Sequence, residues 1–246
     1  MSHLFLKFYI KRACIFFSLL SGVLVASALL PNQASASAMP EIDNTTTSNI
    51  YTNDFSFSHT GDSSGENLLA VVLVSHRYDA LGSVESVTYG GETMTLASTT
   101  GEGLAYIYYL ADAPTGTQTV SLDILPAAYA AGRPVIATAI TITGADLDNP
   151  IDSLARYDSA SDNSIDTTIT TTQDNVLILD VLGATTGNNP TVTGTDHTSI
   201  QDGTYSYGIY GFGYKEASTA GNHTLGWSTS NQTNDLGLAL IGIAPY

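Results

Sequence analysis

The chain contains one stretch twice, and this internal repeat constrains its fold more than any other feature. Residues 106–122 hold two strand-like runs around a Pro-Thr-Gly turn, and residues 211–227 repeat them. A chance match of turn residues would not keep one spacing along the whole stretch. The sequence therefore predicts two copies of one strand plan, each organised around a hairpin of this kind. The matched residues are all separated by 105 positions and are Tyr109 and Tyr214, Gly116 and Gly221, Thr119 and Thr224, and Val120 and Leu225.

The segments around the two stretches are typical of strands. Residues 67–75 are almost continuously apolar, which favours a central strand covered on both faces, and residues 176–182 are their counterpart in the second copy. No segment has the apolar stripe of a helix. Ten or more short strands, separated by Gly, Asn, Asp and Pro, predict an all-β fold: a two-sheet antiparallel β-sandwich of jelly-roll-like type, built from two similar halves.

The predicted domain comprises residues 54–246, with halves at 54–145 and 164–246 and a polar seam between them. Two arrangements remain open, namely one sandwich in which the halves interlock or two small sandwiches in tandem. We favour the single domain because five or six strands without disulfides bury only a thin core. Residues 39–53 are rich in Thr and Asn and predict a polar N-terminal tether or a ragged first strand.

The first 38 residues predict a secretory signal peptide. They carry three basic and no acidic side chains, an apolar run at residues 13–30, and small-residue cleavage sites after Ala36 or Ala38. An uncleaved membrane anchor is the alternative, since the apolar run is nearly long enough to span a bilayer. The small-residue sites favour cleavage, and hence a secreted, extracellular or cell-surface protein with no membrane association afterwards.

Removal of this leader would leave a strongly acidic protein. All 23 acidic residues but only four of the seven basic ones lie beyond it, which gives a formal charge of −19. Such a surface repels phosphate backbones, so nucleic acid is not an expected partner. The only cysteine, Cys14, lies inside the leader, so we expect neither disulfides nor a reactive thiolate in the remainder.

Several motifs resemble those of a known group of proteins. Residues 87–95 read Val-Thr-Tyr-Gly-Gly-Glu-Thr-Met-Thr, and further matches lie at residues 109–117, 143–146 and 174–177. Together they resemble secreted bacterial β-sandwich modules of concanavalin-like or jelly-roll type, which mostly lack an assigned function and often recur in large surface proteins. The resemblance covers nearly the whole chain beyond the leader, although Asp235-Leu236 stands where these modules commonly have Trp. It implies a fold and a location, and it brings no catalytic residues.

Strand alternation separates the tyrosines into two groups. Tyr109 and its repeat partner Tyr214 are predicted to point into the core, and their neighbours fall on the opposite face. An exposed tyrosine row beside a glycine-flattened strip is a candidate platform for sugar rings or for another surface protein, with ordinary cross-strand packing as the alternative. The candidate ligand-binding residues are Tyr106, Tyr108, Tyr205 and Tyr207.

The seam between the halves is a candidate calcium site. Asp146, Asp148 and Asn149 lie within four residues, and calcium prefers several oxygen ligands on a bent loop. The full Asp-x-Asp-x-Asp-Gly spacing is absent, and a solvated acidic loop is the alternative. Apart from such a structural calcium, no cofactor is expected.

Candidate catalytic groups are sparse. His76 with Asp79, or His197 with Asp196, would supply half of an acid–base pair, although a loop histidine without a chemical role is the simpler interpretation. We therefore expect a protein that acts in binding or adhesion, with an extracellular glycan or another surface protein as its partner, and not an enzyme.

Two other functions stay open. One is a structural or assembly role in the extracellular matrix or at the cell surface. The other is a glycoside-active enzyme on a jelly-roll scaffold, which needs two carboxylates facing each other across a cleft. The carboxylates inside predicted strands are chiefly Glu85, Asp123 and Asp180.

Overall fold

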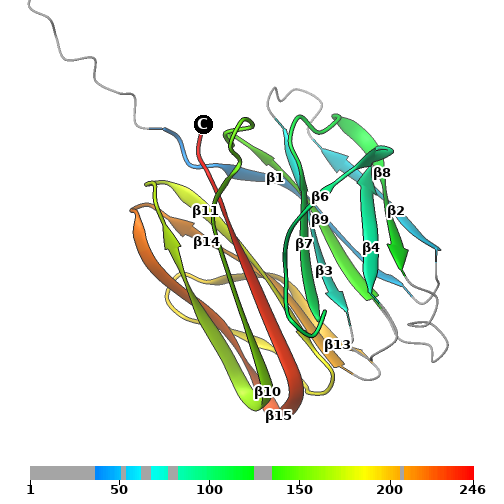
Figure 1. The fold of residues 1–246 in the computed structure, drawn as a ribbon, viewed down its shortest axis with the longest axis vertical. Coiled ribbons are helices and arrows are strands. Elements are labelled where there is room, and N and C mark those ends of the chain that lie inside the picture. The colour runs from blue at the N-terminus through cyan, green and yellow to red at the C-terminus, as the bar shows by residue number, and fades with distance from the viewer. Residues whose placement is uncertain (1–36, 51–53, 62–67, 77–82, 125–134, 206–207) are drawn as a thin grey trace, which may run out of the picture. The chain divides into compact units, whose positions relative to one another are not determined.

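The computed structural model describes residues 37–50, 54–61, 68–76, 83–124, 135–205 and 208–246, and residues 37–246 belong to one compact unit (Figure 1). All regular secondary structure in these ranges is β-strand, and the strands pair antiparallel. The predicted all-β antiparallel sandwich built from two similar halves is therefore confirmed. Most of the predicted signal peptide lies outside the described residues.

The strands of the described ranges are numbered β1 to β15 along the chain. Their bounds are β1 (Glu41–Ile50), β2 (Asp54–Gly61), β3 (Leu69–His76), β4 (Val84–Tyr89), β5 (Glu92–Thr93), β6 (Thr95–Thr99), β7 (Ala105–Leu110), β8 (Gly116–Ile124), β9 (Val135–Thr143), β10 (Ile151–Thr171), β11 (Val176–Ala184), β12 (Thr191–Thr193), β13 (Thr198–Tyr205), β14 (Gly208–Ala217) and β15 (Gly221–Ile243). Residues 41–50 form β1. The sequence had allowed either a polar tether or a ragged first strand in this region.

The described strands make three sheets. The first half contributes a five-stranded sheet, β1-β9-β3-β7-β6, and a four-stranded sheet, β2-β8-β4-β5. The second half contributes a six-stranded sheet, β10-β15-β11-β14-β13, with β12 attached to β15. Because β10 and β15 are more than twenty residues long, their two ends take part in different layers, and the six-stranded sheet folds over itself.

Each half has an apolar core of its own. The first-half core lies between the four- and five-stranded sheets and includes Val72 and Leu122. The second-half core lies between the two layers of the folded sheet and includes Ile178, Trp227 and Leu238. Since β15 supplies Trp227 from one end and Leu238 from the other, one strand covers both sides of this core.

A third core joins the halves. This central core includes Leu73 and Ile140 from the first half and Leu179 and Phe212 from the second. Alternate residues of β3 enter either the central or the first-half core, which explains why the whole strand is buried and apolar. The prediction of a central strand covered on both faces is confirmed for β3, and β11 behaves in the same way.

The two halves repeat one topology. The order β10-β15-β11-β14-β13 of the second half reproduces β1-β9-β3-β7-β6 of the first, strand for strand. The register is also repeated, since Val87 lies opposite Leu122 and Val192 lies opposite Trp227, which are the positions 105 residues further on. The internal repeat predicted from the sequence is therefore a structural repeat.

The contacts between the halves have the pattern of a two-fold axis. Strand β3 contacts its own counterpart β11, while β3 with β14 and β7 with β11 form a reciprocal pair of contacts. This exchange of partners resembles an isologous interface, in which the same surface is used from both sides. The relation is approximate, because the contacts of β15 with β7 and β6 and of β10 with β6 are more extensive than their counterparts in the other half. The chain therefore resembles a two-fold dimer of sandwiches joined into one polypeptide.

Two sequence expectations need correction. Residues 106–122 do not form a hairpin, because β7 pairs with β3 and β6 while β8 pairs with β2 and β4, so the turn carries the chain from one sheet to the other. The seam expected at residues 146–163 is largely strand, since β10 begins at Ile151. Alternation in the sequence predicts a strand but does not say with which strand it pairs, which explains the first correction. An exposed edge strand such as β10 needs no alternating apolar residues, which explains the second.

The close approach of the halves predicts a sensitive position at Gly183 on β11. A Cβ atom there would lie 2.2 Å from the backbone oxygen of Leu104, which is too close for any side chain. We expect Gly183→Ala to lower the free energy of unfolding by about 1–3 kcal/mol, measured by denaturant titration. Gly101→Ala is the matched control, since its Cβ would meet only the Asp158 side chain at 3.3 Å. Equal stability of the two variants would contradict this packing.

Candidate functional site

A trough runs along one side of the junction between the halves, where β1 approaches β13 and β14. It consists of two adjoining hollows of about 500 and 460 Å³ that share Tyr214 and Glu216. Hollows of this size suit small organic ligands or a short stretch of a polymer. The trough combines groups from both halves, because Glu41, Ile42 and Thr45 come from β1.

The lining of the trough is part apolar and part acidic. Leu177 is buried, and Ile200 and Tyr214 are half-buried against the central core. The carboxylates of Glu41 and Glu216 are exposed, so they lie in water above apolar surface. Such a lining offers an aromatic ring for stacking and carboxylate oxygens that accept hydrogen bonds.

The position of Tyr214 follows from the alternation of β14. Phe212 points into the central core, and Tyr214, two residues on, lies on the same face. Tyr109 is its counterpart on β7, and both rings pack against the central core without being fully covered. The prediction that these two tyrosines point into the core is confirmed, with one side of each ring left open.

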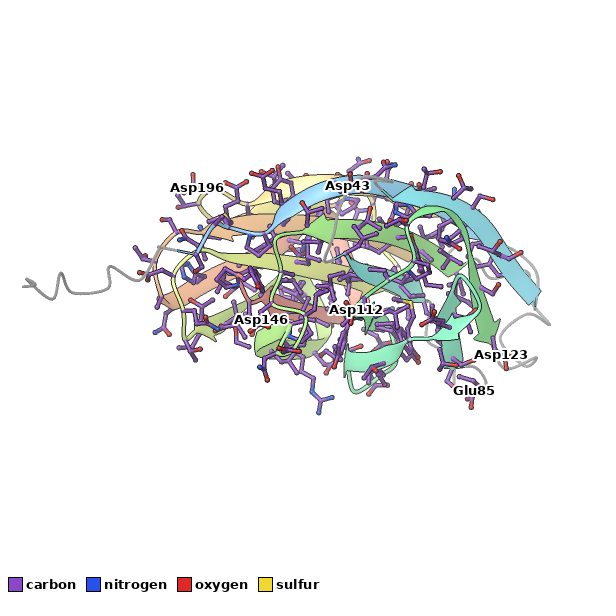
Figure 2. The ribbon with its side chains drawn as sticks, turned by 90° about the horizontal axis from the view of Figure 1, so that it is seen from above. Asp43, Glu85, Asp112, Asp123, Asp146 and Asp196 are labelled. Atoms are coloured by element: carbon purple, nitrogen blue, oxygen red, sulfur yellow. The ribbon has the colours of Figure 1, made fainter. Side chains whose placement is uncertain are left out.

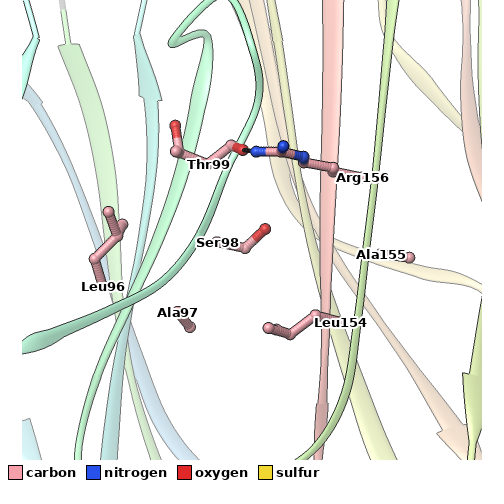
Figure 3. Close-up of a pocket in the computed structure, with 7 residues that line it drawn as sticks. All are labelled: Leu96, Ala97, Ser98, Thr99, Leu154, Ala155 and Arg156. Carbon is pink, nitrogen blue, oxygen red and sulfur yellow. Dashed lines mark hydrogen bonds between the residues drawn. The ribbon is translucent and has the colours of Figure 1, made fainter.

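The opposite side of the junction holds the counterpart of the trough, a groove of about 430 Å³ between β6 and β10 (Figure 3). Leu96, Ala97 and Leu154 line it, and Nη1 of Arg156 donates a hydrogen bond of 2.7 Å to the backbone oxygen of Thr99. The two related grooves thus differ in charge, because one is lined by carboxylates and the other by an arginine.

Beside the trough lies a buried polar cluster of three side chains. Nε2 of His197 lies 2.6 Å from Oδ2 of Asp180, and Nε1 of Trp227 donates to Oδ1 of the same carboxylate at 2.6 Å. The Asp180 carboxylate is completely buried. Asp196 and Thr198, on either side of His197, line the trough, so the cluster anchors one of its walls.

The positions of this cluster are apolar in the first half. Repeat register matches Asp180 with Val72, His197 with Met94 and Trp227 with Leu122, and all three counterparts lie in the first-half core. Three apolar side chains therefore fill the same positions of the fold in the first half. The second half has a hydrogen-bonded histidine–carboxylate pair instead, which is a charge pair when His197 is protonated. Removal of one member would leave the facing polar atom of the other without its partner in the core.

The pKa of His197 is raised above its ordinary value of 6.5. Burial acts to lower it, but the hydrogen bond and the charge of Asp180, together with the carbonyl of Thr193, outweigh burial. The second buried histidine, His59, behaves in the opposite way. Its pKa is lowered by burial, with a smaller opposing effect of Asp43, and its ring nitrogens lie 2.8 and 3.3 Å from threonine hydroxyls.

The three described tyrosines of the predicted platform do not form an exposed row. Tyr106 and Tyr108 are only 6% and 3% exposed and belong to the first-half core, so their predicted exposure is wrong. The four-stranded sheet covers the face of β7 on which these two tyrosines lie, which the sequence had predicted to be exposed. Tyr205 is half-buried and stacks on Tyr210 with ring centroids 6.3 Å apart, and Tyr207 lies outside the described residues.

The proposed calcium ligands form a local turn. Oδ1 of Asp146 accepts hydrogen bonds from the backbone N–H groups of Asp148 and Asn149 at 3.0 and 3.1 Å. This is the way Asp side chains usually close a turn. Within the described ranges, no three histidine, cysteine or acidic side chains are grouped so as to hold a metal ion. Calcium at this loop stays a prediction.

The carboxylates predicted for glycoside chemistry do not face one another across a cleft. Glu85 and Asp123 lie on neighbouring strands of the four-stranded sheet (Figure 2), and Asp180 is buried in the other half. His197 has Asp180 as its partner, where the sequence suggested Asp196. Asp79, the suggested partner of His76, lies outside the described residues.

Sequence reasoning missed the trough. Tyr214 and Glu216 alternate on one face of β14, which the sequence allows one to infer, but Glu41 comes from about 170 residues away. Only the two-fold packing of the halves brings β1 to β14. An available signal for the buried cluster was Asp180, an acidic residue inside an otherwise apolar strand.

Neither protein-family models nor curated proteins provide a match to this chain. In the described part of the chain, no helix is long and apolar enough to cross a membrane. The function of the trough therefore has to be inferred from its own chemistry.

The raised pKa of His197 predicts how stability depends on pH. The charge pair contributes its full stabilisation below pH 6.5 and loses it as the pH rises through the raised pKa. Trp227 is the only tryptophan of the chain, so its fluorescence reports directly on this pair. We expect a fluorescence titration with a midpoint above 6.5 that is absent in His197→Met. A midpoint at or below 6.5 would contradict the assignment.

Single and combined substitutions of the cluster should differ sharply. Asp180→Val alone leaves Nε2 of His197 and the Trp227 N–H group without their partner in the core, and we expect a loss of about 3–5 kcal/mol in unfolding free energy. The triple variant with Asp180→Val, His197→Met and Trp227→Leu reproduces the first-half set. We expect it to be more stable than the single variant in denaturant titrations. If the triple variant lost as much unfolding free energy as the three single variants together, the two sets of side chains would not be equivalent.

Proposed function

We propose that this protein is a secreted or cell-surface β-sandwich that acts by binding an extracellular polysaccharide, and that the trough between β1 and β14 is its binding site. The observation that carries the proposal is the half-buried ring of Tyr214 in the same trough as the Glu41 and Glu216 carboxylates. An aromatic face stacks on the apolar face of a sugar ring, and carboxylates accept hydrogen bonds from its hydroxyls.

The charge of the protein supports a neutral polymer as ligand. The chain has 23 acidic and seven basic residues, and among the described residues that line the trough none is basic. An anionic polymer would be repelled by such a lining. Secretion rests on the predicted signal peptide, and an extracellular location would bring the protein into contact with polysaccharides.

The elongated form of the trough also supports a polymer. Two hollows adjoin at Tyr214 and Glu216, and the second continues past Asp196 to Thr198 and Ser218. The hydroxyl groups of these last residues add donors as well as acceptors along its length. A ligand that repeats along one direction can use both hollows at once, whereas a small ligand would fill one.

A second candidate function is cleavage of a glycosidic bond at the same place. Glu41 and Glu216 come from different strands and line one hollow, which is the kind of arrangement that a two-carboxylate mechanism requires. One carboxyl would act as the acid and the other as the base or nucleophile. Release of reducing ends from a bound polysaccharide, abolished in both Glu41→Gln and Glu216→Gln, would favour this function over simple binding.

The binding function predicts a specific effect of Tyr214→Ala. A glycan array with the purified protein identifies the ligand, and calorimetry then gives the affinity. We expect the Tyr214→Ala variant to bind about tenfold more weakly, because one aromatic stacking contact is lost. Tyr109→Ala is the matched control, since it removes the equivalent ring on the other side of the central core and should leave affinity unchanged.

Two outcomes would contradict the proposal. One is an array on which the protein binds no glycan, which would favour a structural or assembly role instead. The other is an equal loss of affinity in Tyr214→Ala and Tyr109→Ala when both variants keep the thermal stability of the parent. Such equality would mean that the trough is not where the glycan binds.

A further inference from the structure

Strand β10 has a free edge. It is an edge strand of the six-stranded sheet and pairs only with β15. In the described part of the chain, no strand pairs with its outer side. Its 21 residues make it one of the two longest strands. A long open edge is a template for pairing with another chain, and proteins usually shield such edges with charges or keep them short.

Large apolar side chains are exposed on this edge strand. Leu154 is 49% exposed and Tyr157 is 52% exposed, and Leu96 on the adjoining β6 is 46% exposed. Among the described residues these are three of the four large hydrophobic side chains that are classed as exposed. Leu96 and Leu154 line one groove, and Tyr157 lies on the opposite face of β10, so exposed apolar side chains flank this edge on both faces and indicate an interaction surface.

The matching edge in the first half lacks these side chains. Strands β1 and β10 correspond residue by residue, because each has a bulge at the same place, after Ile42 in β1 and after Ile151 in β10. This alignment matches Leu154 with Thr45 and Tyr157 with Ser48. One fold position therefore carries small polar residues in one copy and large apolar ones in the other.

Charges on β10 differ from β1 in the same way. Arg156 corresponds to Thr47 and Asp158 corresponds to Asn49, so the middle of the β10 edge carries an arginine and an aspartate two residues apart, with further aspartates at positions 152, 162 and 166. Each already makes one bond to the turn after β6, from Arg156 to the Thr99 oxygen and from the Gly101 N–H group to Asp158. A guanidinium with five N–H donors retains capacity for a further carboxylate.

In a symmetric antiparallel pair of two β10 strands the two-fold axis passes through one residue, which faces its own copy. An axis at Leu154, Tyr157 or Ser159 sets Arg156 opposite an aspartate in both copies. Of these, Tyr157 lies at the middle of the run between the two bulges of β10 and therefore gives the longest regular pairing. An axis at Arg156 would oppose two arginines, and an axis at Asp158 would oppose two aspartates. An axis at Tyr157 stacks two tyrosines and sets Arg156 opposite Asp158 twice. Both charge pairs are then favourable, and the aromatic pair lies at the centre.

We propose that β10 is a homodimer interface, at which the edge strands of two copies of this chain pair antiparallel about Tyr157. The pairing extends the six-stranded sheets of the two copies into one continuous sheet. Leu154 of each copy is covered in the pair, and the free backbone groups of residues 153–161 become hydrogen-bonded. The interface lies on the opposite side of the junction from the trough, so it leaves the proposed binding site open.

Charge reversal tests the register of this pairing. Arg156→Asp places two aspartate pairs in the interface and Asp158→Arg places two arginine pairs there. We expect each single variant to dimerise roughly thirtyfold more weakly in sedimentation velocity, because two attractive pairs become repulsive. The double variant with both changes restores opposite charges and should regain the dimer. Thr47→Asp on β1 is the matched control and should dimerise like the parent.

Circular dichroism and thermal unfolding of each variant establish that the fold is intact, since both side chains also bond to the turn after β6. A parent protein that stays monomeric at every accessible concentration would overturn the proposal and make the β10 charges simple edge protection. A parent dimer that is unaffected by the single reversals, or a double variant that fails to recover it, would also overturn it.

Discussion

The contact between the five-stranded and six-stranded sheets is the constraint on which the rest of this structure depends. The central strands of these sheets, β3 and β11, are apolar on both faces, so neither can be exposed to water on either side. Burial of both faces of β3 and β11 stabilises the halves together as well as separately. The backbone of Leu104 touches β11 where Gly183 lacks a side chain, which shows how closely the two sheets approach.

The candidate sites are consequences of this packing. Two twisted sheets joined back to back leave an open furrow along each side of their junction. Because the halves repeat one topology and pack with an approximate two-fold relation, the two furrows occupy equivalent places in the fold but have different side chains. One has Tyr214 with carboxylates, and the other has Leu154 with Arg156. Duplication thus gives one scaffold two surfaces that can change independently, one for a ligand and one for a partner.

Much of the strand plan could be predicted from the sequence. The run at residues 69–75 and the Gly90-Gly91 turn, where both residues have positive φ, specify local structure directly. The 105-residue spacing also predicted the repeat, and the matched registers of Val87 and Val192 confirm it. These features depend on neighbours in the chain, which is why single-sequence reasoning can find them.

The site could not be predicted in the same way. Tyr106 and Tyr108 alternate as exposed residues would, but a second sheet from the same half covers them. The approach of Glu41 to Tyr214 depends on how the two halves pack, and nothing local to either residue records it. Parity along a strand indicates which residues share a face, whereas long-range packing decides whether that face meets water.

The two-fold packing of the halves is the central claim, and cross-linking tests it most directly. In a Cys14→Ser background, cysteines are placed in pairs and joined by a short bifunctional reagent, with mass spectrometry as the readout. Thr45→Cys with Ile200→Cys spans the trough, and Ala97→Cys with Leu154→Cys spans its counterpart. We predict rapid intramolecular cross-links for both pairs and none for Thr45→Cys with Ala97→Cys. Cross-linking of the mismatched pair, with neither matched pair reacting, would contradict the account.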